Sequence, residues 1–143
     1  QIDAYLSRVS GPLLDRMDIQ VEVPSLSYEK LADNRPTESS EKIRERVLRA
    51  REIMNKRYAG TKIRANGDLT PAMIREYCVL DDAAQEVLKA AFDRMGLSAR
   101  GYDRILRVAR TVADMHGCEI IGKEHVAQAV QFRNLDRKYW KNA

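Results

Sequence analysis

Strong helix boundaries in close succession constrain the fold of this chain more than any other feature. Thr70 precedes Pro71, and a capping hydroxyl before a proline is a favourable start for a helix. Gly96 ends one apolar helical stretch, and Ser98 caps the next one two residues later. Because 44% of the 143 residues are hydrophobic, these helices can share a core. The pattern therefore predicts a compact helical bundle.

Apolar residues recur at helical spacing in five stretches. We expect helices from the cap residues at 37–40 to about Tyr58, from Pro71 to about Cys78, from Asp82 to Gly96, from Ala99 to about His116, and from Lys123 to about Asn134. The apolar stripe of the first helix is Ile43, Val47, Ala50 and Met54, and Asp82 with Gln85 is expected to form a capping box at the start of the third.

One arginine near the start of the chain lies between two short predicted elements. Residues 10–24 read SGPLLDRMDIQVEVP, in which the apolar residues of 19–23 alternate as they do in a half-buried strand. Arg16 falls just before that strand. It has two readings: a surface arginine that pairs with Asp15 or Asp18, which is common and weak, or a ligand for a phosphate.

A second group of arginines lies on the fourth predicted helix. Residues 98–114 read SARGYDRILRVARTVAD, and Arg100, Arg104 and Arg107 occupy the face opposite the apolar one. A helix N-terminus attracts anions, and an arginine in the first turn adds a bidentate phosphate donor. The alternative is an ordinary solvated basic stripe.

Both motifs resemble Mg-chelatase-like AAA+ proteins of the ComM (YifB) competence type. The resemblance implies that Arg16 is an arginine finger that reaches the nucleotide of a neighbouring subunit. It implies that Arg100, or alternatively Arg104, is the sensor 2 arginine that touches the nucleotide of its own subunit. It further implies a homo-oligomeric ring, expected to be a hexamer, that uses ATP and Mg²⁺.

The fold that this resemblance implies is mainly helical. Residues 1–24 correspond to the end of an α/β ATPase core with one short strand, residues 25–37 to a linker, and residues 38–143 to a C-terminal helical lid of four to five helices. Because the chain begins at Gln1 with an isolated helical turn and strand, we expect it to be a piece of a larger protein.

The parts that hold a triphosphate and magnesium are missing from the sequence. It contains no GxxxxGK[ST] loop and no apolar strand that ends in an Asp-Glu pair. We therefore expect the chain alone to bind neither ATP nor Mg²⁺ and to be inactive as an ATPase. For the whole protein, the resemblance implies ATP hydrolysis coupled to DNA branch migration in transformation or recombination.

Two other functions stay open from the sequence. One is the ATPase subunit of a magnesium chelatase, and the other is a stand-alone helical DNA-binding or scaffold module. The net charge of +4 permits DNA binding, and the helix that contains residues 42–57 is rich in Lys and Arg, although its interleaved glutamates would repel phosphates. The tail at 138–141, Lys-Tyr-Trp-Lys, could stack on bases or pack back onto the bundle.

The cysteines and histidines show no catalytic or metal-binding spacing. Cys78 and Cys118 lie far apart, and His116 and His125 have no partner at a recognisable spacing. We expect packing or capping roles for all four and no metal site. No apolar run is long enough for a membrane span, so we expect no membrane partner and a cytoplasmic location.

Overall fold

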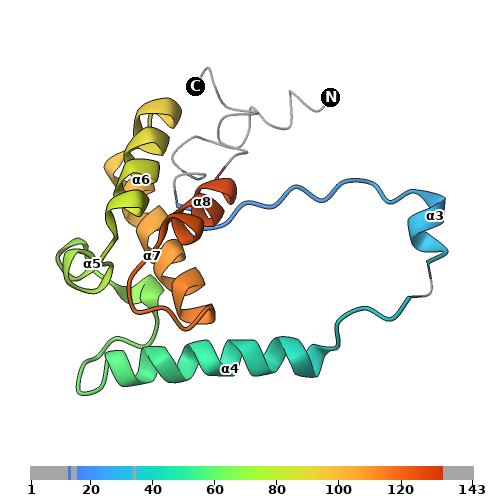
Figure 1. Ribbon diagram of the computed structural model, residues 1–143, viewed down its shortest axis with the longest axis horizontal. Coiled ribbons are helices and arrows are strands. Elements are labelled where there is room, and N and C mark those ends of the chain that lie inside the picture. The colour runs from blue at the N-terminus through green and yellow to red at the C-terminus, as the bar shows by residue number, and fades with distance from the viewer. Residues whose placement is uncertain (1–12, 14–15, 34, 134–143) are drawn as a thin grey trace.

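The computed structural model describes residues 13, 16–33 and 35–133, and this part of the chain is mainly helical. Five helices are longer than one turn: α4 (Ser40–Arg57), α5 (Pro71–Tyr77), α6 (Asp82–Met95), α7 (Ala99–Met115) and α8 (Lys123–Gln131). A one-turn helix, α3 (Tyr28–Leu31), and a 3-10 turn, η1 (Asn66–Asp68), complete the described elements. The predicted helical bundle is thus confirmed (Figure 1).

Helix α7 forms the centre of the bundle. It packs against α8, α4, α5 and η1, while α6 packs on α8. Its apolar face is fully buried at Ile105, Ala109 and Ala113, as the periodicity predicts. A helix covered on several sides in this way fixes the positions of the arginines on its remaining surface.

Local capping sets most helix boundaries where the sequence places them. The Ser98 hydroxyl accepts a hydrogen bond from the Gly101 amide (3.0 Å), and Gly96 ends α6 with a left-handed φ of 62°. Helix α6 starts at Asp82 as expected, but its capping residue lies one position earlier, because the Asp81 carboxylate accepts from the Ala84 amide (2.7 Å). The predicted capping box at Asp82 is therefore wrong.

The reason for this shift is a short parallel contact just before α6. The Ile121 amide donates to the carbonyl of Val79 (2.9 Å), and the Asp81 amide donates to the carbonyl of Ile121 (3.1 Å). These bonds hold the chain extended as far as Asp81, so the helix begins immediately after it.

The first half of α4 projects beyond the bundle (Figure 1). Ala50 and Met54 are buried, but Ile43 and Val47 of the same apolar stripe are 45% and 46% exposed. The periodicity that predicted one continuous buried face is therefore correct only for the half of α4 that lies against α7. Burial depends on a covering surface, which a periodic pattern cannot supply.

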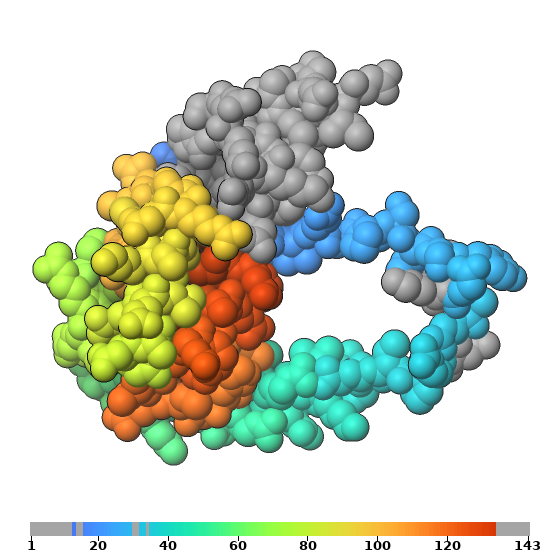
Figure 2. Space-filling model, turned by 45° about the horizontal axis from the view of Figure 1, so that its top comes forward, coloured from blue at the N-terminus to red at the C-terminus, as the bar shows by residue number. Residues whose placement is uncertain are grey.

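The strand predicted over residues 19–23 is wrong in the described structure. Residues 19–27 form no regular element, and Val21 and Val23 are largely exposed. A strand needs neighbouring strands for its backbone groups, and the Gln20 amide instead donates to the carbonyl of Phe132 (2.8 Å). Figure 2 shows the extended segment arching away from the bundle towards α3, with an open space between it and α4.

Some predicted features lie outside the described residues. These are most of the opening helical turn and the tail at 138–141. Helix α8 ends at Gln131, three residues before the predicted end at about Asn134. Across the part of the chain that is described, no helix combines the length and the apolar character that crossing a membrane requires.

Candidate functional site

Arg16 lies in the short segment that leads towards the bundle. Its amide donates to the carbonyl of Leu13 (3.0 Å), which closes a turn, and its side chain is exposed. Among the described residues it forms no ion pair. Pairing with Asp18 is therefore not seen, and Asp15 lies outside the described residues.

The residues after Arg16 are hydrogen-bonded to Phe132 and Arg133, which follow directly after α8. Arg133, only 1% exposed, donates from Nη1 to the carbonyl of Met17 (2.8 Å). The amide of Gln20 donates to the carbonyl of Phe132, at the end of α8. Residues 17–20 are thus held by main-chain hydrogen bonds although they form no regular element.

Arg104 forms an ion pair with this same segment. Its Nη1 donates to Oδ1 of Asp18, across 86 positions in sequence. The Arg104 side chain is 20% exposed and that of Asp18 is 51% exposed. The described structure therefore joins Arg104, one of the two predicted nucleotide contacts, to a carboxylate two residues after Arg16.

Arg100 remains exposed in the first turn of α7. The Ser98 hydroxyl accepts a hydrogen bond from the Gly101 amide. Arg100 forms none of the ion pairs found among the described residues. An uncommitted guanidinium beside the positive end of a helix is suited to an anionic ligand.

Arg107 has a structural contact instead. Its Nη2 donates to the main-chain carbonyl of Leu69 (2.6 Å), which follows η1. The arginines at 100, 104 and 107 therefore do not form one uniform solvated stripe. One is exposed, one pairs with Asp18, and one holds the loop before α5.

A buried polar cluster at the other end of α7 was not predicted from the sequence. Asp114 is 1% exposed, and both of its carboxylate oxygens accept hydrogen bonds. Oδ2 accepts from Arg57 Nη1 (2.8 Å) and from the side-chain Nδ2 of Asn66 (2.9 Å), and Oδ1 accepts from Arg110 Nε (3.1 Å). The cluster joins α4, η1 and α7. The four-residue spacing of Arg110 and Asp114 was the only local signal for it.

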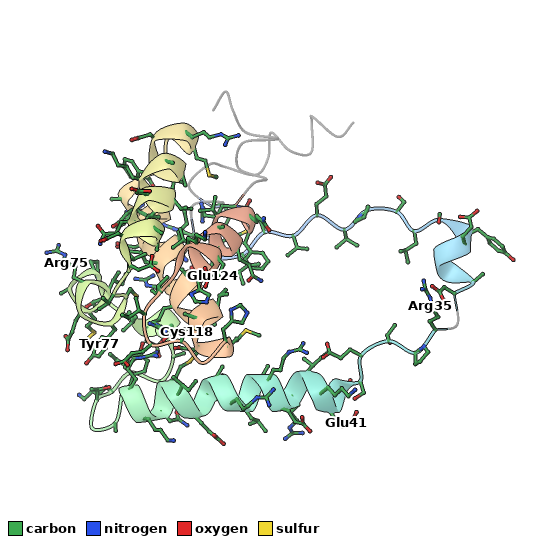
Figure 3. All side chains as sticks on the ribbon, viewed as in Figure 1. Arg35, Glu41, Arg75, Tyr77, Cys118 and Glu124 are labelled. Carbon is green, nitrogen blue, oxygen red and sulfur yellow. The ribbon has the colours of Figure 1, made fainter. Side chains whose placement is uncertain are left out.

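The charges of this cluster depend on one another. Burial lowers the pKa of Arg110, while the hydrogen bond to Asp114 raises the pKa of Arg57. Arg110 also donates to the carbonyls of Cys118 and Glu119. One carboxylate therefore pairs with two guanidinium groups, and Arg110 also fixes the turn after α7. Cys118, which belongs to this turn, is labelled in Figure 3.

Cys78 and His125 are packed in the interior as we expected, whereas Cys118 is only partly buried and the His116 side chain is exposed. Burial raises the pKa of the Cys78 thiol to about 11. His116 caps the end of α7, and its ring centroid lies 5.1 Å from that of His125. His125 is buried and accepts a hydrogen bond at Nδ1 from the Gly122 amide (2.9 Å), and burial lowers its pKa.

No metal site is found in the part of the chain that is described. None of its groups of His, Cys, Asp and Glu side chains could hold a metal ion, so these residues do not fit the Mg²⁺ that the family resemblance implies. An open groove of about 840 Å³ lies between α6 and α7, lined by residues that include Leu80, Glu86, Phe92 and Tyr102. Its described lining contains none of the three predicted arginines.

Comparisons with known proteins cover nearly the whole chain. A family model described as magnesium chelatase, subunit ChlI C-terminal, matches residues 37–133, and one described as magnesium chelatase, subunit ChlI, matches residues 1–31. The competence protein ComM of Haemophilus influenzae is 41% identical over 96% of this chain and 26% of its own length.

Two further relatives have no assigned function. YifB of Escherichia coli is 38% identical over 93% of this chain and 26% of its own length, and a protein of Mycobacterium tuberculosis is 39% identical over 90% and 25%. The chain thus spans about a quarter of the curated relatives that it matches. The C-terminal family model covers most of this chain, and the described residues have the mainly helical fold expected for the lid. The chain therefore belongs to the magnesium chelatase ChlI C-terminal family.

Proposed function

We propose that this chain supplies two arginines to the ATP sites of a ring-forming AAA+ ATPase. Arg16 acts in trans on the nucleotide of the neighbouring subunit, and Arg100 acts in cis on the nucleotide of its own subunit. Both guanidinium groups are exposed, whereas Arg57, Arg107 and Arg110 are committed to carboxylates or carbonyls. Other exposed arginines occur on α4 and α6, so the proposal is carried by this exposure at two positions that lie within the family motifs. The phosphate loop and the ligands for Mg²⁺ would come from the rest of the protein.

The chemistry of phosphoryl transfer fits this division of roles. The reaction is accelerated mainly by positioning and by positive charge at the γ-phosphate oxygens. A guanidinium supplies a permanent charge and two parallel N–H donors, which a lysine cannot reproduce. Arg100 would hold the phosphates from the first turn of α7, while Arg16 would approach from the adjacent subunit.

The mechanical work of the ring is proposed to be DNA branch migration during transformation or recombination. The name of the Haemophilus relative, a competence protein, supports it. The exposed Arg44, Arg49 and Arg51 on α4 provide charge for DNA phosphates. A second candidate is the ATPase subunit of a magnesium chelatase, which the description of the family model favours.

Mixed rings of the full-length protein test the arginine assignments. Subunits with Arg16→Ala are mixed with subunits whose phosphate loop is defective. Because a finger acts in trans, some interfaces then combine an intact loop with an intact finger, and ATPase activity should partly return. Arg94→Ala, which removes an exposed arginine at the end of α6, is the matched control and should turn over normally. No recovery at any ratio, in rings that assemble, would contradict the trans role.

The substrate is tested separately on wild-type rings. Branched DNA should stimulate ATP hydrolysis, and the stimulation should fall steeply with salt. Stimulation by a porphyrin substrate and not by DNA would favour the chelatase.

A further inference from the structure

The segment that carries Arg16 is held by the helical bundle of its own chain. Three contacts join residues 17–20 to α7 and to the end of α8: Met17 carbonyl with Arg133, Asp18 with Arg104, and Gln20 amide with the Phe132 carbonyl. They come from three successive parts of the segment, so they restrain its direction as well as its position.

Two of these contacts are made by the main chain of the segment, and they differ from the third. Arg133 is 1% exposed and Gln20 is 8% exposed, so both main-chain hydrogen bonds are protected from water. The Asp18–Arg104 ion pair is partly open to solvent. Of the three contacts, this ion pair is therefore the one most easily altered by a change at the surface of α7.

The short distance along the chain makes this ion pair relevant to Arg16. Two residues span at most about 7 Å even when fully extended, so the Cα atom of Arg16 cannot move far from Asp18. A fixed Asp18 restricts the region that the Arg16 guanidinium can sample. A finger must place its charge accurately, because small displacements from the reacting group cost a large share of the rate.

We propose that Asp18, held by Arg104 of its own lid, is a positioning residue for the Arg16 finger. This inference rests on the proposed trans role of Arg16. The ion pair fastens the finger segment to α7, so a movement of the lid in one subunit also moves the finger that serves the next subunit. Arg104 accordingly serves the finger segment, and Arg100 alone serves the nucleotide.

The test uses full-length rings and follows kcat and KM separately. Asp18→Ala should lower kcat for ATP hydrolysis about tenfold or more, because the finger is misplaced, while KM for ATP stays within about twofold because no nucleotide contact is lost. Arg104→Ala should have the same effect. Asp33→Ala is the matched control: it breaks another exposed Asp–Arg ion pair, with Arg35, and should leave both constants unchanged.

Rescue separates positioning from general damage. Asp18→Glu should retain most of kcat, and the exchange of charges in Asp18→Arg with Arg104→Glu should restore activity that either single change removes. In mixed rings, the Asp18→Ala defect should appear at the adjacent site, as for Arg16→Ala. Hydrogen exchange of the full-length protein should show a less protected Gln20 amide in Asp18→Ala.

Three results separate the possible failures. If Arg16→Ala turns over as wild type, the proposed function itself is wrong. If Arg16→Ala is slow but Asp18→Ala and Arg104→Ala match wild type, the positioning role alone is overturned. If Arg104→Ala raises KM and the exchange of charges restores nothing, Arg104 binds the nucleotide, which also overturns it.

Discussion

The two ends of α7 use the same residue type in opposite ways. At the carboxyl-terminal end, Arg110 is 1% exposed and is bonded to Asp114 and to two carbonyls. At the amino-terminal end, Arg100 is exposed and forms no ion pair among the described residues. The difference lies in the neighbours: a buried carboxylate assigns an arginine to the fold, whereas exposure beside a helix N-terminus leaves it available to a ligand.

The largest expected effect comes from removing the carboxylate at the buried end. Asp114→Ala leaves Arg57 and Arg110 without their shared partner, and uncompensated buried charge costs about 3–5 kcal/mol. We expect urea unfolding of this chain, followed by circular dichroism, to show a loss of that size. Asp93→Ala, on the exposed surface of α6, is the control and should change stability little. Equal midpoints for the two variants would refute a structural role for the buried cluster.

A smaller effect is expected from the cap at the exposed end of α7. Ser98→Ala removes the hydroxyl that accepts from the Gly101 amide, and losing such a cap costs about 1 kcal/mol. The same change at Ser39, which caps the projecting end of α4, should cost less in global unfolding because that end lies away from the core. Thermal unfolding of both variants measures the difference, and a greater loss for Ser39→Ala would contradict the central place of α7.

A pH dependence should arise near the buried end from His125. Burial keeps the pKa of this histidine below its ordinary value of 6.5 in the folded chain. Below about pH 6.5 the unfolded chain therefore binds more protons than the folded one, and stability falls as the pH is lowered towards the folded pKa. Urea unfolding between pH 7.5 and 5 should show a shallower pH slope for His125→Gln. Equal pH slopes for the wild type and His125→Gln would exclude a contribution of His125 to the pH dependence of stability.

Local signals predicted more of this molecule than long-range ones. Thr70-Pro71, Gly96 and Ser98 mark helix ends correctly because caps act within a few residues. The periodicity predicts Ile43 and Val47 to be buried, but both are exposed. Their burial would need a covering surface, which the spacing of residues along one helix does not describe.

The candidate site divides in the same way. The sequence motifs predict roles for Arg16, Arg100 and Arg104, but they do not reveal that Asp18 pairs with Arg104 across 86 positions. The Arg57–Asp114 pair, separated by 57 positions, was likewise invisible. Such pairs are set by how the helices pack, so residue spacing along one helix cannot predict them.

The smallest expected effect on stability belongs to Arg100 itself. Arg100→Ala removes an exposed side chain without an ion pair among the described residues, so its unfolding free energy should stay within about 0.5 kcal/mol of the wild type. Arg110→Ala should be far less stable, since it removes the Arg110 donor from two carbonyls and one of the two donors to Oδ1 of Asp114. Equal losses for the two variants would remove the contrast between the ends of α7.

The most direct measurement is the ATP turnover of full-length rings that carry Arg100→Ala, compared with rings that carry Arg94→Ala. If exposure at the amino-terminal end of α7 marks a nucleotide contact, kcat/KM should fall about a hundredfold for Arg100→Ala alone, while both variants unfold like the wild type. Wild-type turnover in correctly assembled Arg100→Ala rings would contradict the account.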